Sequence, residues 1–137
     1  MTGNPEPVVP AAAALTGAPA RRVAKPWGYE HIWAETERYA GKLIAIEAGQ
    51  RLSLQLHERK EESVYVLAGL LRLHLEDAAG EMQHVDLGPG DHAYVPVRRR
   101  HRFEALERVE LIEVSTADLD DVIRLEDDFG REGTSAP

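Results

Sequence analysis

Four side chains with metal-binding atoms carry the most chemistry in this sequence. Gln55 and His57 lie two residues apart in the alternating segment 51–57, so a β-strand would direct both side chains to one face. Glu62 follows five residues after His57, and His101 comes much later in the chain. If the strands close with these faces inward, one amide oxygen, two imidazoles and one carboxylate converge. Such a donor set suits Zn²⁺ or another divalent first-row metal.

The elements that must position these residues are predicted to be short β-strands. Alternating or β-branched stretches predict strands, and glycines mark the turns between them. The predicted strands are residues 51–57, 63–68, 71–76, 92–97 and 109–114. Several short strands at spacings of about 8–12 residues favour an antiparallel sandwich or barrel. A short helix is an alternative only for residues 116–125, which can equally be irregular.

Length and composition indicate one globular domain. The chain has 137 residues, of which 43% are hydrophobic and 29% charged, and this is enough for one core. Residues 1–22 are rich in Ala, Pro and Gly, so we expect a flexible leader there. We expect the barrel domain to span residues 23–131 and a C-terminal tail to span residues 132–137.

Charge and cysteine content exclude several function classes. The formal net charge of -8 argues against a protein that coats nucleic acid. The absence of cysteine excludes disulfide scaffolds, thiolate metal sites and thiol nucleophiles. No apolar run approaches the roughly 20 residues of a membrane helix, and the arginines near the N-terminus follow the apolar stretch instead of preceding it. We therefore expect a cytoplasmic protein that binds no membrane.

The spacing of these residues resembles the two sequence motifs of the cupin family. The first motif is matched by Gly49, Gln55, His57, Glu62 and Gly69, and the second by Gly90, Pro96 and His101. Gln55 stands where the family usually has histidine. The resemblance implies an all-β fold, the double-stranded β-helix or jelly-roll barrel, with one divalent metal ion inside. It also implies the metal ligands, which are Gln55, His57, Glu62 and His101.

Three stretches resemble more narrowly the C-terminal cupin domain of type II mannose-6-phosphate isomerases. They are Gln55 within segment 51–57, the Lys-Pro-Trp-Gly-Tyr of residues 25–29, and the Arg-Leu-Glu-Asp-Asp-Phe-Gly-Arg of residues 124–131. The nucleotidyltransferase domain that often precedes this cupin is absent, so we expect a stand-alone cupin. The usual glycine between Pro96 and His101 is Arg98 here. A positive φ would cost an arginine about 1 kcal/mol or more at this position, so the turn is expected to differ.

The narrower resemblance implies the interconversion of an aldose and a ketose phosphate, in which a base moves a proton between C1 and C2. Lys60 is the first candidate for catalysis, provided that burial near a cation lowers its pKa, and Glu61 is the second. Arginine suits phosphate because its donors form a planar fork. The predicted substrate-binding residues are Tyr29, Arg51, Ser53, Arg100 and Arg131.

Three hypotheses for function remain open at this point. The first is an isomerase of mannose 6-phosphate or a related sugar, the second a non-catalytic sugar-binding or regulatory cupin, and the third an Fe(II) oxygenase. Gln55 weakens the third, because cupin oxygenases more often use three histidines. Zn²⁺ is the expected metal, although Mn²⁺, Ni²⁺, Co²⁺ and Fe²⁺ accept the same ligands. We expect a sugar phosphate or nucleotide sugar as the small-molecule partner and a homodimer as the assembly.

Overall fold

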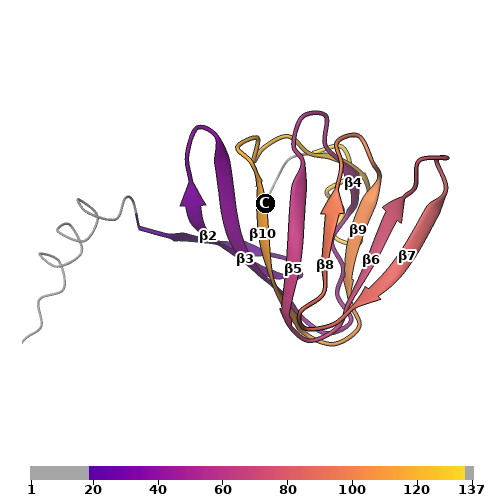
Figure 1. Cartoon of the computed structure of the whole chain (residues 1–137), viewed down its shortest axis with the longest axis horizontal. Coiled ribbons are helices and arrows are strands. Elements are labelled where there is room, and N and C mark those ends of the chain that lie inside the picture. Colours follow the sequence, from indigo (N-terminus) through magenta and orange to yellow (C-terminus); the bar gives the residue numbers. More distant parts are fainter. Residues whose placement is uncertain (1–18, 135–137) are drawn as a thin grey trace, which may run out of the picture.

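The computed structural model describes residues 19–134 and confirms the all-β prediction. Most of the predicted leader and part of the predicted tail lie outside the described residues. The described part contains no helix, and so none that could cross a membrane. Its strands, labelled in Figure 1 where there is room, are β1 (Arg21–Lys25), β2 (Gly28–Glu35), β3 (Tyr39–Ile46), β4 (Leu54–Leu56), β5 (Glu62–Ala68), β6 (Leu71–Glu76), β7 (Met82–Leu87), β8 (His92–Val95), β9 (His101–Ala105), β10 (Val109–Thr116) and β11 (Ile123–Glu126).

The strands form two antiparallel sheets. One sheet has the order β1-β2-β3-β10-β5-β8, and the other has the order β11-β4-β9-β6-β7. Sequence neighbours β4 and β5 lie in different sheets, as do β8 and β9, so the chain crosses repeatedly between the sheets. Figure 1 shows the two sheets facing each other. This crossing brings residues at the beginnings of β5 and β9 close together although they are far apart in sequence.

The space between the sheets is apolar at one end and polar at the other. On β10 the buried positions are Val109, Leu111, Glu113 and Ser115, so burial follows the period of two while polarity changes along the strand. The apolar end is a cluster that includes Phe103, Leu71, Leu73, Val64 and Val66. Because apolar side chains fill that end, charged side chains are gathered at the other, where the site lies.

Several elements differ from the sequence prediction. Strands β1, β2, β3, β7, β9 and β11 were not predicted, and β1 begins at Arg21, inside the predicted leader. The helix alternative for residues 116–125 is wrong. Residues 117–122 form turns, and β11 then pairs with β4, which satisfies the backbone groups that a helix would have satisfied internally.

In the turn before β9, Arg98 stands where the resembled motif has glycine, and it adopts the positive φ that favours glycine. Arg98 has a φ of 59°, and among the described residues it is the only non-glycine with positive φ. Its backbone N–H donates to the carbonyl of His57 at 2.7 Å. The turn that leads to His101 is therefore tied to the loop that carries His57.

Candidate metal centre and pocket

The polar end of the barrel brings three predicted ligands together. His57 follows β4, Glu62 begins β5 and His101 begins β9. The Nε2 atom of His57 lies 3.5 Å from Glu62 Oε2, and the Nε2 atom of His101 lies 3.6 Å from Glu62 Oε1. One ligand atom from each of the three residues lies within 4.8 Å of the other two. All three side chains are buried.

Backbone carbonyls fix the orientation of both imidazoles. The Nδ1 atom of His57 lies 2.5 Å from the carbonyl oxygen of Asp121, and that of His101 lies 2.9 Å from the carbonyl oxygen of Arg99. A carbonyl only accepts, so each Nδ1 carries the proton and each Nε2 keeps its lone pair toward Glu62. Burial lowers the pKa of His57 to about 4 and also lowers the pKa of His101. Both imidazoles are therefore neutral at pH 7, as a metal requires.

The donor set fits a divalent cation. His101 Nε2 is buried and has no hydrogen-bond partner among residues 19–134, although a polar atom without a partner is costly in an interior. Burial would raise the pKa of Glu62, but the charge of Lys60 and the nearby histidines bring it to about 2, so the carboxylate is ionised. Two neutral imidazoles and one carboxylate form the open set of protein ligands typical of a catalytic divalent metal.

Gln55, the fourth predicted ligand, lies beside this group. It pairs with His101 across β4 and β9. Its Oε1 accepts a hydrogen bond from the Ser53 hydroxyl at 2.7 Å, and its Nε2 lies 3.5 Å from His57 Nε2. In this conformation the amide nitrogen faces the centre. A half-turn of the amide would present the oxygen instead and leave an N–H for Ser53. The ligand role of Gln55 stays a prediction.

Lys60 is the nearest cation to the ligands. Its Nζ atom lies 3.0 Å from Glu62 Oε2 and 3.1 Å from Glu113 Oε2. Burial would lower the pKa of Lys60, but the two carboxylates raise it above its usual value. This differs from the lowered pKa expected from sequence, and it leaves Lys60 as an ammonium group. In this state Lys60 can donate a proton or a hydrogen bond.

The ion pairs continue away from the ligands. Lys42 Nζ lies 3.9 Å from Glu113 Oε2 and 3.0 Å from Glu30 Oε1. The charges thus alternate through Glu62, Lys60, Glu113, Lys42 and Glu30. Burial and the negative charge of Glu62 raise the pKa of Glu113. This charge network connects the metal ligands with the far wall of a pocket.

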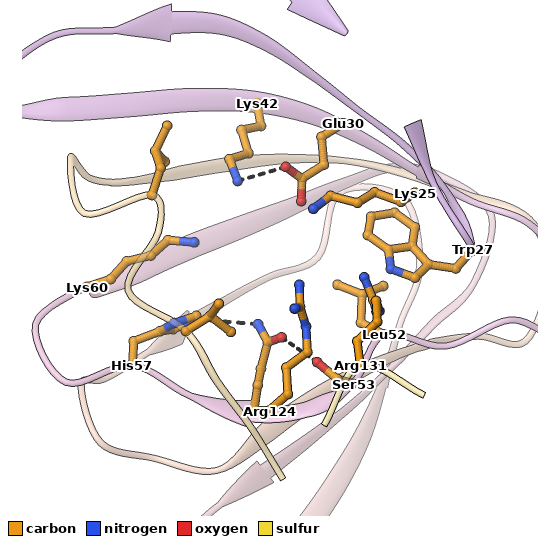
Figure 2. Close-up of a pocket in the computed structure, with 13 residues that line it drawn as sticks. Lys25, Trp27, Glu30, Lys42, Leu52, Ser53, His57, Lys60, Arg124 and Arg131 are labelled. Carbon is orange, nitrogen blue, oxygen red and sulfur yellow. Dashed lines mark hydrogen bonds and ion pairs between the residues drawn. The ribbon is translucent and has the colours of Figure 1, made fainter. Parts of the chain in front are cut away.

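That pocket opens beside the candidate centre, and Figure 2 shows its lining. The described lining residues are Lys25, Trp27, Glu30, Lys42, Leu52, Ser53, Gln55, His57, Lys60, Leu119, Val122, Arg124 and Arg131. Five of them are cationic and Glu30 alone is acidic. The Nε of Arg124 and one terminal nitrogen of Arg131, Nη1, are buried and have no hydrogen-bond partner among the described residues. The lining therefore suits an anionic, polar ligand.

The other predicted site residues divide between this pocket and the surface. Of the predicted substrate-binding residues, Ser53 and Arg131 line the pocket. Arg51 instead contacts Asp128 at 2.7 Å, Arg100 contacts Glu76 at 3.4 Å, and Tyr29 stacks with Arg22. Glu61 is exposed and accepts a 3.4 Å hydrogen bond from Tyr94. The structure does not place Arg51, Arg100, Tyr29 or Glu61 at the pocket.

Sequence reasoning missed several residues that shape the site. They are Lys25, Glu30, Lys42, Glu113, Asp121 and Arg124. For Glu113 a signal existed, because it occupies the register of Val109 and Leu111 in a predicted strand. A charge in an inward register indicates a buried partner. No comparable pattern marks Asp121, which lies in a turn.

Comparison with known proteins identifies relatives. The family described as "Mannose-6-phosphate isomerase C-terminal" matches residues 16–127. Mannose-1-phosphate guanylyltransferase ManC of Salmonella typhimurium is 38% identical over 117 residues, covering 81% of this chain and 23% of the relative. Mannose-1-phosphate guanylyltransferase of Escherichia coli K12 is 34% identical over the same shares of both chains. The chain thus spans about a quarter of the length of these relatives.

Solved structures resemble this fold. Oxalate decarboxylase from Bacillus subtilis superposes with a TM-score of 0.70 at 22% identity, covering 77% of this chain and 30% of that one. KdgF from Halomonas superposes with a TM-score of 0.62 at 26% identity, covering 74% of this chain and 88% of that one. The jelly-roll barrel predicted from the sequence motifs is confirmed.

Proposed function

The chain belongs to the family of mannose-6-phosphate isomerase C-terminal domains and has the cupin fold, and on this premise we propose that it is a metal-dependent isomerase of a phosphorylated sugar. Its substrate would be mannose 6-phosphate or a related aldose phosphate. One observation carries the proposal: two neutral imidazoles and the ionised carboxylate of Glu62 lie together beside a pocket, which His57 lines and in which five of the six charged lining residues are cationic.

His57, Glu62 and His101 would hold the metal ion, and the Gln55 oxygen would complete the set after its amide turns. We propose Zn²⁺, which accepts nitrogen and oxygen ligands and leaves positions open in catalytic sites. When bound, such a cation supplies Lewis-acid polarisation to the substrate oxygens. The carbonyls of Asp121 and Arg99 keep the two imidazoles in the required tautomer.

The phosphate would bind at the cationic wall. Arg124 and Arg131 have unpartnered buried donors there, and Lys25 lies beside them. Burial lowers the pKa of Lys25, so an anion that enters this wall would restore favourable interactions for its charge. The guanidinium groups would bind phosphate oxygens through charge-assisted hydrogen bonds. This wall would hold the sugar with its carbonyl end toward the ligands.

Lys60 would act from the ligand side of the pocket. Its ammonium group donates to Glu113 and forms an ion pair with Glu62, and a further N–H remains for a substrate oxygen. We propose that this N–H stabilises the negative charge that develops on that oxygen as the carbon-bound proton leaves.

One observation favours a second candidate function. Two carboxylates hold Lys60 as an ammonium group, so the first catalytic candidate from the sequence has no lone pair with which to take a proton. This favours a metal-containing cupin that binds a sugar phosphate or nucleotide sugar without turning it over. Thermal stabilisation by such ligands, without any product, would support this second function.

The direct test is an isomerase assay on the purified protein loaded with Zn²⁺, Mn²⁺ or Co²⁺. We expect interconversion of mannose 6-phosphate and fructose 6-phosphate, or of another pair in a panel of hexose and pentose phosphates. His101→Ala should abolish both turnover and stoichiometric metal in elemental analysis. Arg108→Ala is the matched control, because Arg108 is exposed and its ion pairs within residues 19–134 are with Glu47 and Glu110, away from the pocket. No turnover with any substrate and metal would exclude the isomerase.

We further propose a cytoplasmic homodimer. The outward residues of the six-stranded sheet include Trp33, Tyr39, Tyr65, Leu67, Tyr94 and Val114, all more than 40% exposed. A cluster of exposed aromatic and aliphatic side chains is typical of an interaction surface. Light scattering on the purified protein would measure the mass, and Tyr65→Lys is expected to shift it to that of the monomer.

A further inference from the structure

Glu30 occupies a distinctive place in the pocket. It lies on β2, and Figure 2 shows its carboxylate directed into the cavity, on the opposite side from His57 and Lys60. Among the described lining residues it is the only acidic one, and its side chain is 13% exposed. The positive charges of Lys25, Lys42 and Lys60 each favour the ionised form of the Glu30 carboxylate. The Glu30 carboxylate would repel a phosphate, because both groups are anions. Its position in a largely cationic pocket therefore indicates a role other than phosphate binding.

The two oxygens of Glu30 are in different situations. Oε1 accepts a hydrogen bond from Lys42 Nζ at 3.0 Å, while Oε2 accepts none from the described residues. Lys42 is itself buried and lies 3.9 Å from Glu113. One oxygen is thus held by a cation within the protein and the other remains for a ligand. Burial would raise the pKa of Glu30, but Lys42 and Lys25 lower it, so the carboxylate is ionised at neutral pH.

Lys60 and Glu30 differ in what they can do with a proton. The Lys60 ammonium lies within 3.1 Å of two carboxylates, which keep it protonated, and it has no lone pair. The Glu30 carboxylate has an oxygen with free lone pairs at the pocket surface. Carboxylates are effective bases toward carbon-bound protons when they lie in a partly dehydrated site beside an activated carbonyl group.

We propose that Glu30 is the catalytic base that carries the proton between C1 and C2, with Lys42 as its positioning residue; this inference rests on the proposed isomerase function. Glu30 takes the proton from C2 of the aldose; the electron pair of that C–H bond forms the C1=C2 bond, and the π pair of the C1=O1 carbonyl moves to O1. The neighbouring O2 hydroxyl passes its proton to O1. The Glu30 carboxylic acid then returns its proton to C1, as the C1=C2 π pair takes that proton and a lone pair of O2 forms the C2=O2 carbonyl. The step is redox-neutral within the sugar and needs no co-reactant.

The test compares the metal-loaded wild-type protein with Glu30→Gln and Glu30→Asp. Glu30→Gln keeps the size of the side chain but removes the base, so kcat should fall by about 100-fold or more, with KM within about threefold. Glu30→Asp keeps the base at a displaced position and should retain more activity than Glu30→Gln. Exchange of the C2 hydrogen of the sugar phosphate in D₂O, followed by NMR, should be lost in Glu30→Gln together with turnover.

Metal content and melting temperature show whether Glu30→Gln is folded, and both should match the wild-type values. Active wild-type protein together with a Glu30→Gln variant that keeps its kcat, or that changes only KM, would overturn the role of Glu30 and leave the isomerase function standing. Retained exchange of the C2 hydrogen in the variant would overturn it as well. Absence of turnover in the wild-type protein would overturn both proposals together.

Discussion

Asp121 holds the His57 loop twice, once through its backbone and once through its side chain. Its carbonyl oxygen accepts the hydrogen bond from His57 Nδ1, and its carboxylate accepts the backbone N–H groups of residues 58, 59 and 60 at 2.6–3.2 Å. These bonds to a charged acceptor lower the pKa of Asp121, although burial opposes the shift. A residue from the turn before β11 thus determines where one predicted metal ligand points.

Asp121→Asn is expected to weaken both the fold and the metal site. The amide keeps one accepting oxygen but turns an NH₂ group toward backbone donors, so we expect a loss of about 1–3 kcal/mol in the free energy of unfolding. Misplacing the loop should weaken metal binding by roughly 10–100-fold. Denaturant unfolding and metal titration would measure these effects. Asp120→Asn is the control, because Asp120 is exposed and its side chain makes no hydrogen bond among the described residues. Equal behaviour of the two variants would refute the role of Asp121.

The pH dependence of the metal-free protein follows from His57. Its folded pKa is about 4, against 6.5 for an ordinary histidine. Between these values the unfolded chain binds a proton that the folded protein does not, so stability is present above pH 6.5 and falls as the pH drops toward 4. The expected loss from this residue has an upper limit of about 3.5 kcal/mol. Unfolding of chelator-treated protein at several pH values would measure it, and His57→Gln should reduce the slope. A constant stability from pH 7 to pH 4 would contradict the argument.

The metal ligands could be predicted because each can be recognised within a short stretch of sequence. Alternation around Gln55 and His57, and the motif spacing of Glu62 and His101, can be read from short stretches of sequence. The partners of these residues depend on tertiary pairing. The Lys60–Glu113 contact joins residues that are 53 positions apart, and no short stretch contains both.

The missed strands have a similar physical cause. β3 is buried at nearly every position, so it shows no alternation between an inner and an outer face. The apolar positions of residues 116–125 were compatible with a helix, but residues 117–122 form turns and pairing with β4 places residues 123–126 in strand β11. Tertiary pairing outweighs local preference in such short segments.

Arg98→Gly is expected to stabilise the protein. An arginine at φ 59° has its Cβ close to the following carbonyl, at a cost of about 1–2 kcal/mol, and glycine avoids this cost but loses more chain entropy on folding. The net gain should be about 1 kcal/mol. Arg98→Ala is the matched control, because it removes the 3.5 Å contact with Glu58 but keeps the strained φ. Thermal melts of both variants would measure the difference, and an Arg98→Gly protein no more stable than Arg98→Ala would refute the strain.

A comparison of Gly69→Ala with Gly49→Ala distinguishes the cost of a positive φ from the cost of a steric clash with a neighbouring backbone. Both glycines have positive φ, 87° and 80°. A Cβ at position 69 would lie only 1.9 Å from the carbonyl oxygen of Arg108, whereas a Cβ at position 49 would meet nothing within 4 Å. Gly49→Ala should therefore cost about 1–2 kcal/mol from φ alone. Gly69→Ala should cost more than about 3 kcal/mol, because the backbone between β5 and β10 must move. Since these strands carry Glu62 and Glu113, Gly69→Ala should also weaken metal binding. Denaturant unfolding gives both costs, and equal values for the two variants would show that the contact with Arg108 does not constrain the barrel.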